Sequence, residues 1–228
     1  MTAVPSPTTV PPPPPAESDR PIEDAVAVVR WAAEHFADEL CVTASFGDPT
    51  LAHLADAAVP GIRITLIDTG YLFAETEWYA DHLRDRFGLH IDILRPSPEL
   101  ERDLWRTDTD ACCAARKVAP LEDLLRGKSA WITGLRRADS RSRRNTPLVH
   151  DDLLRGVTKV NPLAAWTDAH IAHYMSLHEL PEHPLADRDY TSIGCWPCTR
   201  PALDPDDPRS GRWADSDKTE CGLHGRFG

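Results

Sequence analysis

Apolar residues recur along this chain in two alternating patterns, one with helical spacing and one typical of short strands. Residues 22–31 place their apolar side chains at helical spacing, which predicts a helix that begins near Pro21. Short runs rich in β-branched residues follow and alternate with further helical segments. We expect strands at 40–45, 62–68, 90–94 and 130–133, and helices at 49–58, 73–87, 112–126 and 167–177.

This alternation predicts an α/β fold with a mostly parallel sheet and helices on both of its faces. The 228 residues are enough for one domain with a full core, and short for two. Residues 1–20 are rich in Pro, Ser and Thr and are expected to form a disordered tail. Residues 21–213 then form the folded domain, in which the chain beyond Pro181 lacks periodicity, and 214–228 form a mobile C-terminal tail.

The charge balance restricts the classes of partner. The chain has 25 Lys and Arg against 36 Asp and Glu, a formal net charge of -11, which argues against nucleic acid as a partner. An anionic substrate must therefore be held by a local basic cluster. Neither an apolar run of membrane-spanning length nor a secretory signal in residues 1–20 is recognisable, so we expect a cytoplasmic protein without a membrane partner.

Four of the six cysteines have the spacing of metal ligands. Cys112 and Cys113 are adjacent, and Cys195 and Cys198 form a Cys-Trp-Pro-Cys motif. Thiols stay reduced in the cytoplasm, where such a set indicates metal binding rather than disulfides. Adjacent residues on a helix point about 100° apart, which suits two irons of a cluster better than one tetrahedral zinc ion. The spacing favours a 4Fe–4S cluster, with zinc as the alternative.

Cys221 has the surroundings of a reactive thiol. Lys218 precedes it by three residues and His224 follows it by three, and a nearby positive charge lowers the pKa of a thiol. We therefore interpret Cys221 as a nucleophile. Cys41 lies inside a predicted strand and is expected to be a small buried hydrophobic residue.

Two predicted strands end in turns that suit an anion. Ser45-Phe46-Gly47 leads from a strand into a helix, whose N-terminus presents free N–H groups, although an ordinary capped turn would look the same. Gly134 ends another strand, just before a basic cluster. Arginine holds phosphate or sulfate oxygens with two parallel hydrogen bonds. The cluster consists of Arg136, Arg137, Arg141, Arg143 and Arg144. A second basic group, just before Cys221, consists of Arg209, Arg212 and Lys218.

Five motifs, taken together and in order, resemble one family between residues 40 and 224. That family is the assimilatory adenylyl-sulfate reductases, the iron–sulfur branch of the phosphoadenylyl-sulfate reductases. The motifs are Cys112-Cys-Ala-Ala-Arg-Lys-Val-Ala-Pro-Leu121, Trp131-Ile-Thr-Gly-Leu-Arg-Arg137, Lys159-Val-Asn-Pro-Leu-Ala-Ala-Trp-Thr-Asp168, Ser192-Ile-Gly-Cys-Trp-Pro-Cys198, and Asp207-Pro-Arg-Ser-Gly-Arg-Trp213 followed by Lys218-Thr-Glu-Cys-Gly-Leu-His224.

The resemblance implies an adenine-nucleotide α-hydrolase-like fold and reduction of adenosine 5′-phosphosulfate to sulfite and AMP, for cysteine biosynthesis. It implies that the nucleophile Cys221 forms an S-sulfocysteine, from which thioredoxin or a glutaredoxin-like dithiol releases sulfite. The family's cluster ligands correspond to Cys112, Cys113, Cys195 and Cys198. Its substrate-binding residues correspond to Ser45, Phe46, Gly47, Lys117, Gly134, Arg144, Arg209 and Arg212.

Three other interpretations stay open at this point. The enzyme could act on the 3′-phosphorylated substrate, although family members that do so generally lack the four cluster cysteines. A zinc-containing, ATP-dependent sulfur-transfer enzyme could use the same nucleotide fold. A non-catalytic cluster protein could act as a sensor, but it would leave the arginine cluster without a purpose. The nucleotide loop, Ser45-Phe-Gly-Asp-Pro-Thr50, departs from the family. Other members usually carry an acidic or amide residue slightly later in this loop.

Overall fold

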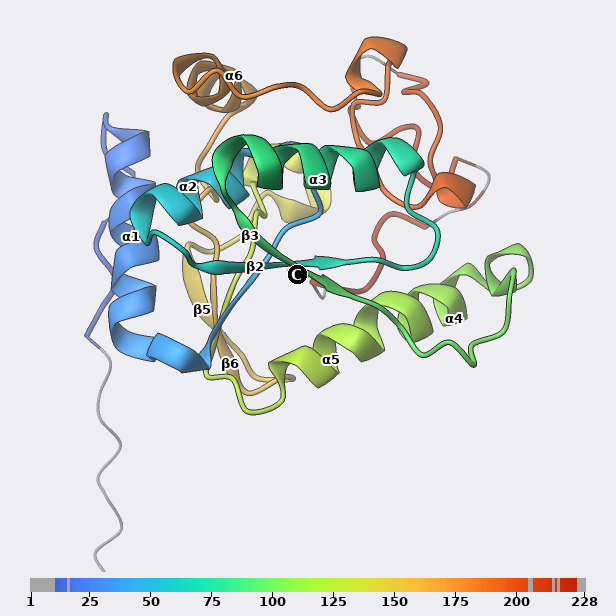
Figure 1. The fold of residues 1–228 in the computed structure, drawn as a ribbon, viewed down its shortest axis with the longest axis horizontal. Coiled ribbons are helices and arrows are strands. Elements are labelled where there is room, and N and C mark those ends of the chain that lie inside the picture. The colour runs from blue at the N-terminus through green and yellow to red at the C-terminus, as the bar shows by residue number, and fades with distance from the viewer. Residues whose placement is uncertain (1–10, 16, 205–206, 215, 217, 225–228) are drawn as a thin grey trace, which may run out of the picture.

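A six-stranded β-sheet forms the centre of the molecule (Figure 1). The computed structural model describes residues 11–15, 17–204, 207–214, 216 and 218–224. The strand order is β3-β2-β1-β4-β6-β5, and every neighbouring pair is parallel except β5 with β6. The strands are β1 (Leu40–Thr43), β2 (Arg63–Ile67), β3 (His90–Leu94), β4 (Ala130–Ile132), β5 (Val149–Asp152) and β6 (Val157–Val160).

Helices cover both faces of this sheet, as the alternating pattern predicted (Figure 1). One hydrophobic cluster joins α1, α2 and α3 to one face of the sheet, and a second joins α5 to the other. The α/β fold with a mostly parallel sheet is thus confirmed. The helices are α1 (Pro21–Phe36), α2 (Thr50–Ala58), α3 (Ala74–Phe87), α4 (Thr109–Cys113), α5 (Ala119–Leu125) and α6 (Asp168–Leu177).

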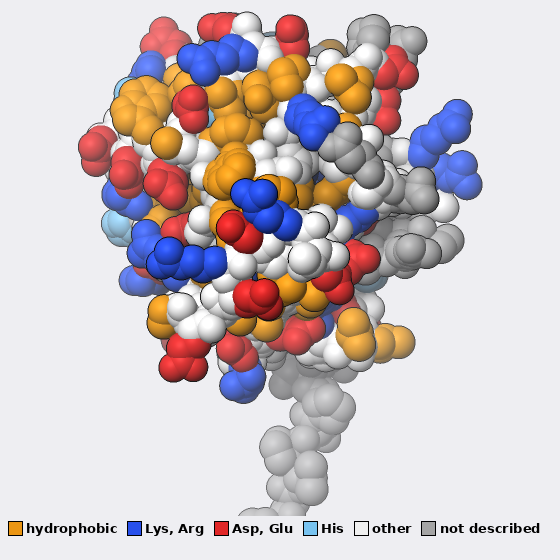
Figure 2. Space-filling view, turned by 90° about the vertical axis from the view of Figure 1, so that its right-hand side faces the viewer, with side chains coloured by type: hydrophobic (Ala, Val, Ile, Leu, Met, Phe, Trp, Pro, Cys, Tyr) orange, Lys and Arg blue, Asp and Glu red, His pale blue; other side chains and the backbone are white. Residues whose placement is uncertain are grey.

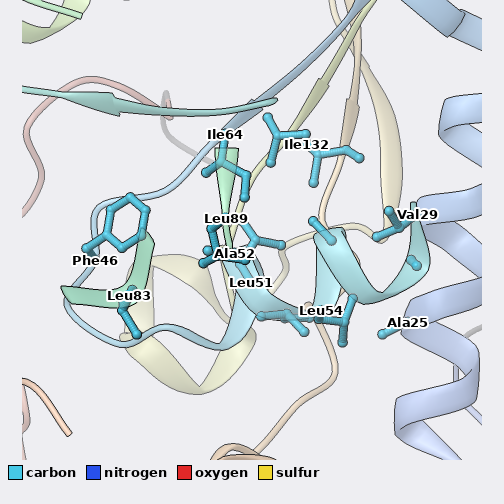
Figure 3. Close-up of a cluster of buried hydrophobic side chains, with 14 of the residues drawn as sticks. Ala25, Val29, Phe46, Leu51, Ala52, Leu54, Ile64, Leu83, Leu89 and Ile132 are labelled. Carbon is cyan, nitrogen blue, oxygen red and sulfur yellow. The ribbon is translucent and has the colours of Figure 1, made fainter. Parts of the chain in front are cut away.

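The larger core contains the apolar side chains that the central strands direct toward the helices on one face of the sheet. Val42 of β1 is paired in register with Ile64 of β2 and Ile132 of β4, so three apolar side chains form a row beneath α2. Figure 3 shows Ile64 and Ile132 in the same cluster as Leu54 of α2 and Val29 of α1. Full burial of such side chains stabilises the fold by about 1.5–3 kcal/mol each. The strands alternate, so that Cys41 and Trp131, their neighbours in sequence, pack on the opposite face.

Two elements differ from the sequence prediction. The helix expected at 112–126 is divided into α4 and α5 by a π-helical turn, Ala114–Val118. The β5–β6 hairpin was not predicted, because Val149-His-Asp-Asp152 carries too many polar residues to resemble a strand. Its antiparallel pairing with β6 at the edge of the sheet compensates for that low strand propensity.

The N-terminal end of the described chain contacts the folded domain. Residues 1–10 of the expected N-terminal tail lie outside the described residues, but the Trp31 indole donates to the Pro11 carbonyl (3.1 Å) and Glu17 pairs with Arg137 (2.7 Å). Beyond Pro181 the described chain has short 3-10 turns and isolated β-bridges, and within the described residues it has neither an α-helix nor a strand of the sheet. None of the described helices is long and apolar enough to cross a membrane.

Acidic and basic side chains are interspersed on the face of the molecule shown in Figure 2. Among the described side chains on that face, Lys and Arg alternate with Asp and Glu and do not form one continuous basic surface. This distribution agrees with the net charge of -11. Any concentration of positive charge that serves a ligand must therefore be local.

Candidate active site

A cavity of about 540 Å³ lies at the carboxyl ends of the central strands. Residues that follow β1 and β4 line it, and these two strands are neighbours from which the chain leaves toward opposite edges of the sheet. Open α/β sheets bind ligands at such a switch point, because the loops diverge there and leave a crevice. The C-terminal segment, residues 218–224, also contributes to the wall through Cys221, Leu223 and His224.

The loop after β1 is anchored by one buried aromatic residue. Phe46 adopts a positive φ of 55°, a conformation that costs a non-glycine residue about 1–3 kcal/mol. Its side chain is only 1% exposed and packs into the core, as Figure 3 shows. The predicted loop is therefore divided: Phe46 holds the backbone, whereas Ser45 and Gly47 line the cavity. Gly134, after β4, lines it as well and lies against Leu51.

Three predicted cations meet at the cavity from distant parts of the chain. Lys117 comes from the π-helical turn, and Arg209 and Arg212 come from the loops beyond α6. Burial lowers the pKa of Arg209 to about 10, and the adjacent Arg143 adds to this effect. Burial also lowers the pKa of Arg212. Cations that are this crowded and desolvated would be stabilised by an anion with several oxygens.

The structure brings Arg143, rather than the predicted Arg144, to the cavity. Arg143 lines the wall and is nearly buried, whereas Arg144 is exposed and is not part of the lining. The two residues lie at the end of a 3-10 turn, Arg141–Arg143, in which successive side chains point about 120° apart. The sequence singled out the basic cluster but could not tell which of its members turns toward the cavity.

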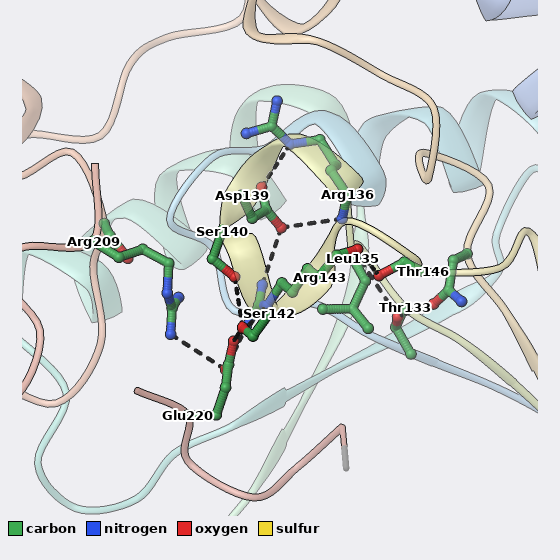
Figure 4. A network of polar contacts seen from close by, with 12 residues as sticks. Thr133, Leu135, Arg136, Asp139, Ser140, Ser142, Arg143, Thr146, Arg209 and Glu220 are labelled. Atoms are coloured by element: carbon green, nitrogen blue, oxygen red, sulfur yellow. Dashed lines mark hydrogen bonds and ion pairs between the residues drawn. The ribbon is translucent and has the colours of Figure 1, made fainter. Parts of the chain in front are cut away.

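Arg143 belongs to a chain of ion pairs along the cavity wall (Figure 4). Its guanidinium pairs with Asp139 (3.0 Å) and with Glu220 of the C-terminal segment (2.8 Å). Asp139 also pairs with Arg136 (2.9 Å), which reaches Asp168 at the start of α6 (2.8 Å). Burial alone would lower the pKa of Arg143, but Glu220 and Asp139 raise it. The network thus keeps a cation fixed beside the cavity.

Cys221 lies in the cavity wall beside these cations. Burial raises the pKa of its thiol, but the charge of Lys117, a hydrogen bond from the Leu223 backbone and the charge of Arg212 lower it, so that the net pKa is below the ordinary value. Burial likewise lowers the pKa of Lys117, while thiolates at Cys195 and Cys221 raise it, and here the net effect is upward. The pair therefore favours a thiolate beside an ammonium group. A thiolate is the nucleophilic form of cysteine.

The four cysteines with ligand spacing come together next to this cavity. Cys112 and Cys113 are buried at the end of α4, and Cys195 lies with its Sγ 3.2 Å from Thr69 Oγ1. Burial raises the pKa of Cys112, and thiolates at Cys113 and Cys195 raise it further. Burial, Cys195 and Cys112 do the same to the pKa of Cys198. These mutual effects mean that all four thiols occupy one region.

These cysteines are free thiols in the structure. Within the described ranges, no three or more His, Cys, Asp or Glu side chains are arranged to hold a single metal ion. Two buried polar groups without a hydrogen-bond partner belong to residues whose backbones adjoin Cys198. The Thr199 hydroxyl directly follows Cys198, and the Trp213 indole N–H belongs to a residue whose backbone donates to the Cys198 carbonyl (2.9 Å).

Sequence reasoning missed an aromatic contact at the far end of the C-terminal segment. The His224 ring stacks on Trp131 of β4, with centroids 5.4 Å apart and planes 16° from parallel. Lys159 of β6 lies over the same indole, 4.6 Å from its centroid, and burial lowers the pKa of this lysine to about 7. The motifs contained all three residues, but only strand pairing shows that Trp131 and Lys159 share a face of the sheet.

The fold and the cavity define an α/β protein in which a cysteine and several cations line one cavity at the carboxyl ends of the strands. A model of the phosphoadenosine phosphosulfate reductase domain matches residues 39–201. The chain belongs to this family, and its expected family resemblance is confirmed.

Curated relatives match nearly the whole chain. The adenosine 5′-phosphosulfate reductase of Streptomyces coelicolor is 45% identical over 215 residues, which cover 90% of this chain and 91% of the relative. The enzyme of the same name from Mycolicibacterium smegmatis is 40% identical over 207 residues, 88% of each chain. A solved phosphoadenylyl-sulfate reductase from Candida auris, in complex with phosphate, shares the fold with a TM-score of 0.67 at 24% identity, covering 80% of this chain and 98% of that one.

A more distant structure has the same fold. The FMN adenylyltransferase of Candida glabrata, in complex with ATP, superimposes with a TM-score of 0.58 at 14% identity and covers 83% of this chain and 67% of that one. At this identity the likeness concerns the fold alone.

Proposed function

We propose that this chain reduces adenosine 5′-phosphosulfate to sulfite and AMP, as the names of its curated relatives indicate. The observation that carries this proposal is the position of Cys221: a thiol with a lowered pKa lines the same cavity as Lys117, Arg209 and Arg212. A nucleophile beside a cluster of cations suits a substrate whose electrophilic sulfur is flanked by anionic oxygens. The proposed pathway context is assimilatory sulfate reduction for cysteine biosynthesis.

In the first half-reaction, the Cys221 thiolate attacks the sulfur of the substrate. An S–S bond forms, the bond between sulfur and the bridging phosphate oxygen breaks, and AMP leaves with the electron pair of that bond. Lys117, Arg209 and Arg212 bind the phosphosulfate oxygens and stabilise the charge that develops on the leaving phosphate. Because burial and neighbouring contacts already fix these cations, they need little reorganisation during the reaction.

In the second half-reaction, a dithiol protein supplies two electrons. One of its thiolates attacks Cys221 Sγ and expels sulfite, and its second thiol then releases Cys221 by forming the disulfide of the partner. Thioredoxin or a glutaredoxin-like protein has the required pair of thiols. The six free cysteines of this chain agree with a reducing compartment, and we propose a cytoplasmic location.

We further propose that Cys112, Cys113, Cys195 and Cys198 hold a 4Fe–4S cluster. Four thiolates are the donor set that this cluster prefers, and the Thr69 hydroxyl lies 3.2 Å from Cys195 Sγ, as a group that hydrogen-bonds to a ligand sulfur would. When bound, the cluster supplies an electrostatic field close to the substrate. Lys117 stands four residues after Cys113 and extends into the cavity, so it would respond to that field.

The remaining substrate contacts follow from the position of the predicted residues. Ser45, Gly47 and Gly134 follow the ends of β1 and β4 and are proposed to contact the nucleotide, with Phe46 fixing the loop from the core. Arg143 takes the place that we had expected for Arg144. In this arrangement residues 21–213 form the reductase domain, and 214–228 form the tail that carries the nucleophile.

The decisive experiment is thioredoxin-dependent sulfite release by anaerobically purified protein. Adenosine 5′-phosphosulfate and its 3′-phosphorylated form are compared at equal concentrations, with Cys221→Ser as the control. We expect a preference for the unphosphorylated substrate and loss of sulfite formation, with retained iron, in the variant. A preference for the 3′-phosphorylated form would overturn the substrate assignment, and zinc with ATP hydrolysis would replace the whole proposal.

A further inference from the structure

Glu220, the residue before the proposed nucleophile, makes four side-chain hydrogen bonds to the cavity wall. Arg143 donates to both of its carboxylate oxygens, from Nε (2.9 Å) and from Nη2 (2.8 Å). The Ser142 hydroxyl donates to Oε1 (3.2 Å), and Arg209 donates to Oε2 (3.3 Å). The side chain is only 18% exposed. Four hydrogen bonds therefore fix this carboxylate from two separate loops.

These contacts connect the tail to a rigid part of the cavity wall. Arg143 is held from the other side by Asp139, which is itself fixed by Arg136 (Figure 4). Charge-assisted hydrogen bonds with two parallel N–H donors restrict both the distance and the angle of the bound carboxylate. The position of Glu220, and with it the backbone of the next residue, is thus defined by the wall.

Two further contacts lie on either side of this one. Lys218 pairs with Asp110 near the start of α4, and His224 stacks on Trp131 of β4. Lys218 and His224 are each three residues away from Cys221, and neither contact involves Arg143 or Arg209. Glu220 differs from these two residues because it directly precedes Cys221 in the chain and also forms hydrogen bonds with the cavity cations Arg143 and Arg209.

We propose that Glu220 is a positioning residue, which holds the Cys221 thiol against Lys117 and Arg212 for attack on the substrate, and whose ion pairs must open before a dithiol partner can reach the S-sulfo group. This inference rests on the proposed function for the two half-reactions. The geometry of the docked tail does not depend on that function, and can be tested separately.

Opening is required for steric reasons. Cys221 is only partly exposed and lines a cavity whose walls include Arg143, Arg209 and the loop around Ile193. We therefore expect a thiol on the surface of another protein to reach Sγ only after the tail has moved. The same contacts that favour the first half-reaction therefore oppose the second. Weakening them should slow one step and not the other, a pattern that general unfolding would not produce.

The first test uses no substrate. In the holoenzyme carrying Glu220→Gln, the pH dependence of Cys221 alkylation is measured by mass spectrometry of the peptide that contains it. If the tail undocks, Cys221 loses Lys117 and Arg212, and the midpoint of alkylation moves to higher pH. If the tail stays docked, loss of the Glu220 charge, which raises the pKa of Cys221, moves the midpoint to lower pH and overturns the proposal.

The second test separates the half-reactions. At saturating adenosine 5′-phosphosulfate, we expect formation of the S-sulfo enzyme to slow at least about tenfold in Glu220→Gln, the scale of one lost charge-assisted hydrogen bond. Release of sulfite from the isolated S-sulfo enzyme by thioredoxin should be as fast as in the unaltered protein, or faster. Equal slowing of both steps would contradict a positioning role.

Two further variants control this comparison. Glu220→Asp keeps the charge on a shorter side chain and should retain part of the first rate. Glu182→Gln makes the same chemical change at an exposed carboxylate in the loop after α6 and should leave both steps unchanged. If no protein, including the unaltered one, forms an S-sulfo species, the proposed function fails, while the alkylation result still decides whether Glu220 positions the tail.

Discussion

At the scale of single residues, the properties of Cys221 depend on groups that are distant in sequence. Lys117 lies about a hundred residues earlier in the chain, yet its charge is the main factor that lowers the pKa of the thiol against the effect of burial. The neighbours in sequence, Lys218 and His224, were expected to have this role. Instead, Lys218 pairs with Asp110 and His224 stacks on Trp131.

Lys117→Met should therefore change the pH profile of the reaction. Because the pKa of Cys221 is lowered in the folded protein, its thiolate is present above that lowered pKa and is lost as the pH falls through it. Without the lysine the pKa rises, so the acid limb of kcat/KM moves to higher pH and the rate at pH 7 falls at least about tenfold. Lys128→Met, at the opposite end of β4, is the control, and an unmoved limb would contradict this role.

Gly194 is needed because Arg212 packs against its α-carbon. A Cβ at this position would overlap the Arg212 guanidinium, so Gly194→Ala should displace the arginine from the cavity. We expect KM for adenosine 5′-phosphosulfate to rise about tenfold, as for loss of one charged contact. Arg212→Lys is the matched comparison and should raise KM to a similar extent. A normal KM in Gly194→Ala would mean that Arg212 does not bind substrate.

At the scale of elements, the π-helical turn between α4 and α5 sets the orientation of Cys112 and Cys113 relative to Lys117, which lines the cavity. The Ala119 N–H donates to the Ala114 carbonyl, five residues earlier, so the turn contains one residue more than an α-helix would. That residue sets the angle between the Cys112-Cys113 pair and Lys117. The helical pattern in the sequence predicted an uninterrupted helix, because apolar spacing does not report a single inserted residue.

Deletion of Ala114 should restore α-helical spacing and turn the cysteines away. Leu121 and Leu125 fix α5 in the second core, so the rotation of about 100° falls on the short helix α4. We expect the variant to fold and to lose most of its bound iron, measured by absorbance and metal analysis after anaerobic purification. Ala114→Ser keeps the residue number and is the control; full iron content after the deletion would show that the turn has no such role.

At the scale of the whole molecule, a buried histidine connects helix α3 to the loops that complete the site. His183, in the loop after α6, accepts from the Leu185 N–H (3.1 Å) and lies 3.0 Å from the Thr76 hydroxyl of α3. Burial lowers its pKa from 6.5 to about 4. The loop that leads to Cys195 and Cys198 is thus attached to the body through a neutral imidazole.

Stability should fall in mildly acidic solution for this reason. Between pH 6.5 and about 4 the unfolded chain binds a proton at His183 that the native state does not, so the contribution is complete above pH 6.5 and decreases below it. The loss is on the order of 2 kcal/mol at pH 5. Urea unfolding at pH 7.5 and pH 5 should show a smaller pH effect in His183→Gln than in the unaltered protein. His173→Gln, at an exposed position, should keep the full effect.

The sequence by itself determined the class of fold and singled out most residues of the candidate site. Alternating strand and helix patterns give a parallel sheet because crossover helices bring each strand back in the same direction, and the motifs contain the proposed site residues, namely the thiols, Lys117, Arg209 and Arg212. These are properties of local spacing and residue chemistry.

Only the tertiary structure decided which side chains face the cavity. The packing of the loop after β4 against the C-terminal segment decides that Arg143, and not Arg144, turns inward. The same packing brings Glu220 to Arg143. The polar edge strand β5 and the stacking of His224 on Trp131 likewise arise from pairing between distant segments. Contacts of this kind are absent from local patterns, because their free energy exists only once the sheet has brought the partners together.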